Sequence, residues 1–119
     1  MTTVFVYGTL KTGLELAYLL AGQEFIGPAR TRPSFRIASL GDGEYPGLYM
    51  SRDAGRSIHG ELWFVTPECL AELDRVEGVA EGFYARRPIG LLPPHESAGA
   101  HAYFYLGDVS GLPDGGTCW

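Results

Sequence analysis

The hydrophobic and polar positions along the chain predict short strands for most of its length. Residues 4–7 are a run of β-branched and aromatic side chains that ends at a glycine, which is typical of a buried strand. In residues 58–65 apolar side chains fall at every second position, as in a strand with one buried face. Residues 83–92 and 100–106 have a similar character, and two further strands interrupted by prolines are expected within residues 24–40.

Two segments have helical spacing instead. Residues 14–21 carry apolar side chains three and four positions apart and are followed by Gly22, a residue that commonly ends helices. Thr66 and Pro67 form an N-cap and first-turn pair, and they begin a helix that Gly78 closes. Six strands and two helices that do not alternate regularly favour the α+β class. We expect a small mixed β-barrel with flanking short helices.

Composition limits the size of the protein and the kinds of partner it has. The 119 residues suit one domain, so residues 1–119 are predicted to be a single folded unit. Hydrophobic residues make up 45% of the chain and charged residues 19%, which argues against disorder. The net charge of -5 and the scattered cations argue against a nucleic-acid or anionic membrane surface. Because neither a signal peptide nor an apolar membrane span is visible, we expect a cytoplasmic protein.

The cysteines and histidines do not predict a metal site. Cys69 and Cys118 are far apart and not in a CxxC pattern, so neither a disulfide framework nor a zinc site is expected. The histidines at positions 59, 95 and 101 have no recognised ligand spacing. Glycine-rich nucleotide loops and the GxSxG nucleophile pattern are absent from the sequence as well. The expected chemistry therefore uses no metal and no cofactor.

Glu77 is the first candidate for acid–base chemistry. It follows Leu73 by four residues, so it lies on the apolar stripe of its helix and points toward the core. The helix dipole disfavours an anion in the last turn, and burial does the same, so both raise the pKa of a carboxyl toward neutrality. In the alternative reading, Glu77 lies at the edge of the stripe and reaches water or an arginine such as Arg75 or Arg86. Asp74 is expected to be a hydrogen-bonding residue at the helix end.

The turn after the first strand is the second candidate. Here a buried strand leads through Tyr7, Gly8, Thr9 and Leu10 toward the first predicted helix. Such a junction presents free backbone N–H groups, and a glycine lets a ligand approach the main chain closely. These properties suit a carboxylate or an oxyanion, although an ordinary turn has the same pattern.

Five segments, taken in order, resemble the γ-glutamyl cyclotransferase superfamily. They are VFVYGTLK at 4–11, GELW at 60–63, LDRVEG at 73–78, YAR at 84–86 and YFY at 103–105. The chain is most similar to the γ-glutamylamine cyclotransferases and AIG2-like proteins of that superfamily. The resemblance spans nearly the whole chain, and it implies a small β-barrel with flanking helices and a cavity at the N-terminal loop.

The resemblance also implies roles for individual residues. In the family, the turn that matches residues 7–10 binds the glutamyl part of the substrate through backbone amides, and the glutamate that matches Glu77 is the acid/base. Tyr84 and Tyr103 match cavity-wall positions, for which a plain core role is the alternative. After Lys11 several relatives carry an Asn-His pair that this chain lacks, so the substrate preference is not carried over.

The implied reaction is intramolecular. The α-amine of a γ-glutamyl group attacks its own side-chain amide, which releases 5-oxoproline and a free amine. Candidate small-molecule substrates are γ-glutamylamines, γ-glutamyl peptides including glutathione, and γ-glutamyl-protected intermediates of secondary metabolism. Eight arginines against one lysine are typical of a GC-rich bacterial genome, which favours the last class. The alternatives are a non-catalytic AIG2-like module that binds a small molecule and, third, a structural subunit.

Overall fold

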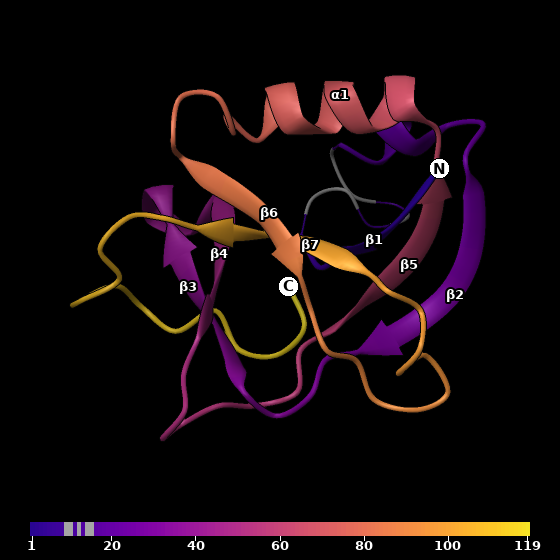
Figure 1. The fold of residues 1–119 in the computed structure, drawn as a ribbon. Coiled ribbons are helices and arrows are strands. Elements are labelled where there is room, and N and C mark those ends of the chain that lie inside the picture. The colour runs from indigo at the N-terminus through magenta and orange to yellow at the C-terminus, as the bar shows by residue number, and fades with distance from the viewer. Residues whose placement is uncertain (9–10, 12, 14–15) are drawn as a thin grey trace.

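A computed structural model of the protein describes residues 1–8, 11, 13 and 16–119, and it shows a mixed sheet with an α-helix lying across it (Figure 1). The described strands are β1 (Thr2–Val6), β2 (Glu24–Arg30), β3 (Phe35–Leu40), β4 (Tyr45–Met50), β5 (His59–Val65), β6 (Tyr84–Pro88) and β7 (His101–Tyr105). The described helices are α1 (Pro67–Val76) and the 3₁₀ turns η1 (Ala17–Leu20) and η2 (Gly41–Gly43). This composition confirms the α+β class. None of these helices is long and apolar enough to span a membrane.

The sheet is open, which differs from the closed barrel that the sequence suggested. Its strand order is β2-β5-β1-β7-β4-β3, with β6 paired to the other edge of β7. The terminal strands β2 and β3 do not pair with each other. Instead, the C-terminal segment bridges β3 and β5, because Ile37 accepts a hydrogen bond from Gly115 (2.7 Å) while His59 donates one to Thr117 (2.7 Å). These isolated bonds do not extend the sheet into a barrel.

Strand β7 is the point at which the sheet divides. One edge pairs with β6 along its whole length, in antiparallel register. The other edge is shared: β1 pairs with it in parallel at His101, and β4 pairs in parallel at Phe104. Strands β1 and β4 do not pair with each other. Tyr7, the residue after β1, therefore lies at the gap between them along the edge of β7.

The helix that the cap signals predicted is confirmed. The Thr66 side chain accepts a hydrogen bond from the Cys69 amide (3.1 Å), and Gly78 takes the positive φ of 68° that ends the helix. The other predicted helix, residues 14–21, is only partly described: residues 14 and 15 lie outside the described residues, and Ala17–Leu20 form a 3₁₀ turn, not an α-helix. Strand β4 was not predicted, since Pro46 is unusual inside a strand.

Strand β1 has both faces buried, and this fixes α1 on the sheet. Phe5 packs into the core on one face, whereas Val4 and Val6 pack on the other against Leu73 of α1. Leu20 of η1 joins this second cluster. The apolar stripe of α1 is thus held against β1, and its C-terminal end is brought next to the division of the sheet.

Candidate active site

A cavity of about 600 Å³ opens where the C-terminal end of α1 meets the end of β1 and the starts of β4 and β6. Much of its wall is aromatic, with contributions from Tyr7, Tyr45, Phe83, Tyr84, Tyr103 and Tyr105. Among the described lining residues, Glu77 is the one acidic or basic side chain apart from the tyrosine hydroxyls. A single carboxyl in an apolar and aromatic pocket is a suitable arrangement for proton transfer.

Glu77 is held at the cavity by the end of α1. It is the C-cap residue, and its amide donates a hydrogen bond to the Leu73 carbonyl (3.0 Å). A side chain on the next residue, Gly78, would place its Cβ 2.5 Å from the Phe83 ring, so glycine lets that ring pack beside the helix end. The backbone geometry therefore fixes both the carboxyl and the aromatic side chain next to it.

Burial raises the pKa of Glu77 from its ordinary value of 4.5 to about 7. In the described part of the chain its carboxylate accepts no hydrogen bond, and desolvation is the cause of the shift. The arginine alternative is not what the structure shows, because Arg75 pairs with Glu72 and Arg86 pairs with Asp74. Glu77 can thus exchange a proton near neutral pH.

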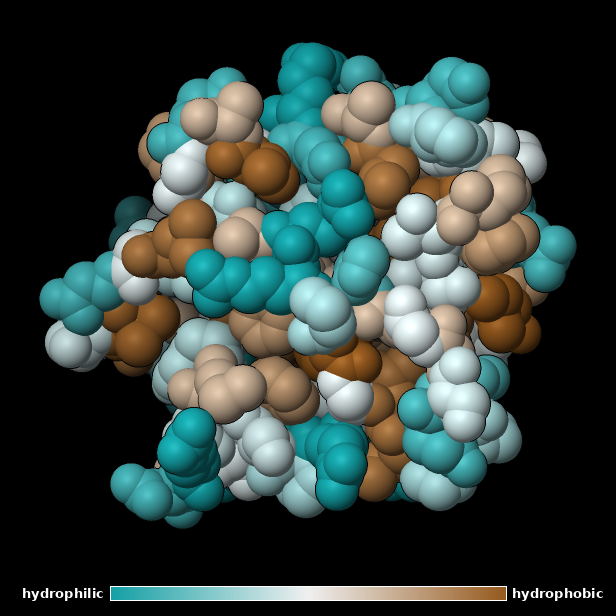
Figure 2. Space-filling view, in the orientation of Figure 1, coloured by the Kyte–Doolittle hydropathy of each residue, from teal (hydrophilic) through white to brown (hydrophobic). Residues whose placement is uncertain are grey.

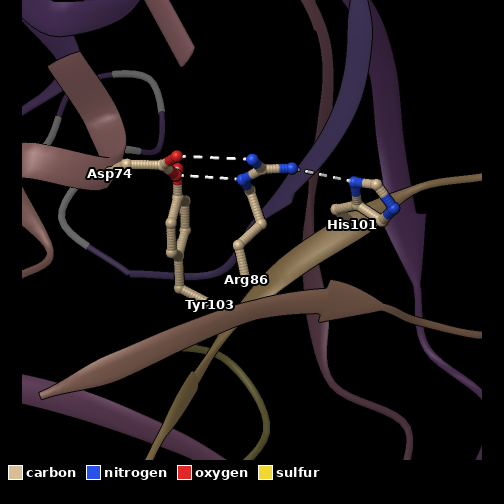
Figure 3. Close-up of polar contacts among 4 residues, drawn as sticks. All are labelled: Asp74, Arg86, His101 and Tyr103. Carbon is tan, nitrogen blue, oxygen red and sulfur yellow. Dashed lines mark hydrogen bonds and ion pairs between the residues drawn. The ribbon is translucent and has the colours of Figure 1, made fainter. Parts of the chain in front are cut away.

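Asp74 connects α1 to the two strands beneath it (Figure 3). It accepts hydrogen bonds from Arg86 Nε on β6 (2.9 Å) and from the Tyr103 hydroxyl on β7 (2.7 Å). Arg86 Nη2 lies 3.3 Å from the second carboxylate oxygen, and Arg86 Nη1 lies 3.2 Å from His101 Nδ1. Asp74 is a hydrogen-bonding residue, as expected, but its carboxylate joins the helix to strands β6 and β7 and not, as the notion of a helix-to-loop bond implies, to the loop that follows.

The three tyrosines predicted at the site contribute their rings to the cavity and their hydroxyls to the protein. The Tyr7 hydroxyl donates to the Tyr103 carbonyl (2.7 Å) and accepts from the Leu48 amide (3.2 Å). The Tyr84 hydroxyl donates to the Pro46 carbonyl (2.9 Å), and the Tyr103 hydroxyl donates to Asp74. Burial raises the pKa of all three phenols, which keeps them neutral.

The predicted binding turn is described only in part. Tyr7 and Gly8 line the cavity, whereas Thr9 and Leu10 lie outside the described residues. A Cβ on Gly8 would come within 2.5 Å of the Pro46 ring, so a glycine is needed for the turn to pack against β4. The structure thus brings together Tyr7, Gly8 and the predicted residues on α1, β6 and β7.

Four lining aromatics were not predicted as site residues: Phe5, Tyr45, Phe83 and Tyr105. Tyr45 is the first residue of β4, a strand that was not predicted. Phe83 lies just before β6, in a run of residues whose pattern predicts a strand but no cavity. A signal was present for Phe83, because it follows the Gly78 turn closely and the helix-end glutamate immediately precedes that turn.

The cysteines lie apart from this cavity. Cys69 is buried on α1 and Cys118 is exposed, and both are free thiols. Among the residues that the structure describes, no three His, Cys, Asp or Glu side chains come together as potential metal ligands.

The pKa of Glu77 predicts how stability depends on pH. Its folded pKa of about 7 exceeds the ordinary value of 4.5, so the folded state binds the proton more tightly and loses stability as pH rises between these values. Glu77→Gln removes this ionisation. We expect the variant to match the wild type at about pH 4 and to exceed its free energy of unfolding by about 3 kcal/mol at about pH 8. Urea unfolding at both pH values checks this, and a difference that does not depend on pH contradicts it.

Comparison with known proteins identifies the family of the chain. The model of the family described as gamma-glutamyl cyclotransferase, AIG2-like matches residues 4–118. Gamma-glutamylaminecyclotransferase A of Danio rerio is 36% identical over 93 residues, which cover 74% of this chain and 57% of the relative. A Vibrio cholerae protein provisionally named a gamma-glutamylcyclotransferase is 38% identical over 76 residues, covering 64% of this chain and 62% of that protein.

The solved structures agree at the level of the fold. An AIG2-like protein of Mus musculus superposes with a TM-score of 0.79 at 27% identity, covering 96% of this chain and 85% of that one. The chain spans roughly half to three-fifths of the length of the curated relatives it matches. With the family match extending over nearly every residue, the chain belongs to the gamma-glutamyl cyclotransferase, AIG2-like family.

Proposed function

We propose that the protein is a γ-glutamyl cyclotransferase, which converts a small γ-glutamyl amide into 5-oxoproline and a free amine. The observation that carries the proposal is Glu77, a single carboxyl whose pKa burial raises to about 7 at the wall of a cavity of about 600 Å³. Membership of the family and the names of the relatives support the same activity. The size of the cavity suits a small molecule.

In the proposed mechanism Glu77 moves the proton that ring closure requires. It takes a proton from the α-ammonium of the substrate, and the free amine attacks the γ-carbonyl carbon. The new C–N bond closes the ring, Glu77 gives its proton to the leaving nitrogen, and the original amide C–N bond breaks. The ring nitrogen passes its remaining surplus proton to the departing amine, which leaves as an ammonium. A group with a pKa near the working pH serves well as both base and acid, and such catalysis contributes about 10²–10⁴-fold.

The cavity walls would hold the folded conformer of the substrate. Backbone amides of the turn at residues 7–10 are proposed to bind the α-carboxylate or the developing oxyanion, although Thr9 and Leu10 lie outside the described residues. The Tyr7, Tyr84 and Tyr103 rings are proposed to enclose the glutamyl chain. Because both reacting groups belong to one molecule, orientation alone can supply several kcal/mol of the roughly 7–11 available to well-positioned systems.

A product assay tests the proposal directly. The wild-type protein is incubated with a γ-glutamyl amide, and 5-oxoproline, glutamate and the free amine are quantified by liquid chromatography. We expect 5-oxoproline and amine in equal amounts and no glutamate. Formation of glutamate would indicate hydrolysis instead. Thermal stabilisation by 5-oxoproline without any turnover would support the alternative, a binding module, and either outcome would refute the proposal.

A further inference from the structure

We propose that the leaving group of the substrate is an uncharged, apolar amine, of the arylalkyl or alkyl type. This inference rests on the proposed function, since it concerns the part of a γ-glutamyl amide beyond the nitrogen that Glu77 protonates. Tyr45 and Phe83 form the mouth of the cavity, and the apolar character of this mouth and of the walls behind it favours such an amine.

Two large aromatic side chains at the cavity are exposed to solvent. Phe83 is 62% exposed and Tyr45 is 53% exposed, although both line the cavity. Each ring lies close to a glycine: the Phe83 ring packs over Gly78, and the Tyr45 ring packs over Gly41. Exposed aromatic rings at the edge of a cavity form an apolar surface that a ligand can cover.

The apolar lining of the cavity extends beyond these two rings. Hydrophobic side chains reach the surface at several places on the face shown in Figure 2, among them the side where the C-terminal end of α1 lies. Leu40, Pro46 and Val76 extend the apolar lining from β3, β4 and α1 respectively. Phe83 packs over the residue next to Glu77, so the apolar surface lies beside the group that would protonate the leaving nitrogen.

Among the described lining residues, Glu77 is the one acidic or basic side chain apart from the tyrosines. Asp74 and Arg86, which are close in sequence to the lining residues Glu77 and Tyr84, pair with each other. A carboxylate on the leaving group therefore meets no free cation among the described lining residues. An ammonium meets only Glu77, the group that must carry the catalytic proton.

The tyrosines of the wall do not change this conclusion. The hydroxyls of Tyr7, Tyr84 and Tyr103 each donate within the protein. Tyr45 and Tyr105 add two further phenol rings to the wall. An unpaired charge placed against such a wall is strongly disfavoured. The described residues thus favour γ-glutamylamides of apolar amines over γ-glutamyl peptides and over γ-glutamyl-lysine.

Two matched substrate pairs test the inference. γ-Glutamyl-phenethylamine differs from γ-glutamyl-phenylalanine by one carboxylate, and γ-glutamyl-pentylamine differs from γ-glutamyl-ε-lysine by the α-ammonium and the α-carboxylate. We expect kcat/KM for 5-oxoproline release to be about 10- to 100-fold higher for the apolar member of each pair. Equal or faster turnover of the charged members would overturn the inference and leave the proposed function standing. If no substrate yields 5-oxoproline, both fail.

A variant of the mouth provides the second test. Phe83→Ala is expected to lower kcat/KM for γ-glutamyl-phenethylamine about tenfold, chiefly through KM, with a smaller effect for γ-glutamyl-methylamine. The matched control is Phe25→Ala, an exposed aromatic on β2 that does not line the cavity. An equal loss for both substrates in Phe83→Ala, or an equal loss in the control, would contradict a role of Phe83 in binding the leaving group.

Discussion

Replacing Glu77 with glutamine is expected to reduce the release of 5-oxoproline by about 10²–10⁴-fold while the protein stays folded. Glutamine has nearly the same shape as glutamate, but it cannot accept the proton of the α-ammonium and return it to the leaving nitrogen. Desolvation is what places the pKa of Glu77 at about 7, and the described residues provide no other carboxyl at the cavity wall to replace it. The loss is expected mainly in kcat, because the substrate's carbon skeleton makes the same contacts in both proteins.

The matched control for this experiment is Glu81→Gln, which removes the same charge from an exposed position four residues further along the chain. Wild-type turnover is expected for the control. The pH profile adds a separate readout: the wild-type rate should show a limb near pH 7 that Glu77→Gln lacks. A folded Glu77→Gln variant with near-wild-type activity would remove Glu77 from the mechanism.

Replacing Asp74 with alanine is expected to lower the free energy of unfolding by about 2–4 kcal/mol. The change leaves the guanidinium of Arg86 and the hydroxyl of Tyr103 without their shared acceptor. The side chains of Asp74 and Arg86 are only 27% and 26% exposed, so water replaces the lost bonds poorly. Urea unfolding at neutral pH measures the effect.

The same helix contains a control for this prediction. Glu72 also pairs with an arginine, Arg75, but the side chains of this pair are 45% and 70% exposed. Water and salt screen surface pairs of this kind, so Glu72→Ala should have little effect. Equal destabilisation by the two variants would show that burial of the Asp74 network is not what gives it its strength.

Local signals were enough to predict α1 and the position of Glu77. Thr66 and Pro67 begin the helix, Gly78 ends it, and the spacing from Leu73 gives the direction of the glutamate side chain. Each of these signals acts within a few residues of the chain. This is why the helix end, and the acid/base candidate on it, could be placed before the fold was known.

Strand β4 and the pairing of Arg86 could not be predicted in the same way. Pro46 and Gly47 disfavour a strand locally, but Leu48 between β3 and β7 is fully buried, and that burial outweighs the local preference. Arg86 was considered as a partner of Glu77, yet it bonds to Asp74, which faces β6. Whether Arg86 pairs with Asp74 or with Glu77 depends on how α1 is oriented on the sheet. That orientation is set by tertiary packing and cannot be read from local sequence.

The Tyr7 hydroxyl has a consequence for how this protein can diversify. It joins β7 to β4 at the place where β1 and β4 both reach the same edge of β7. Tyr7 therefore both lines the cavity and holds two strands together. Because folding depends on this contact, we expect a tyrosine at this position to be retained whatever the substrate. The side chains of Tyr45 and Phe83 are largely exposed, so replacing them should have little effect on the stability of the fold. Substrate preference should consequently change through substitutions at Tyr45 and Phe83, while Tyr7 stays the same.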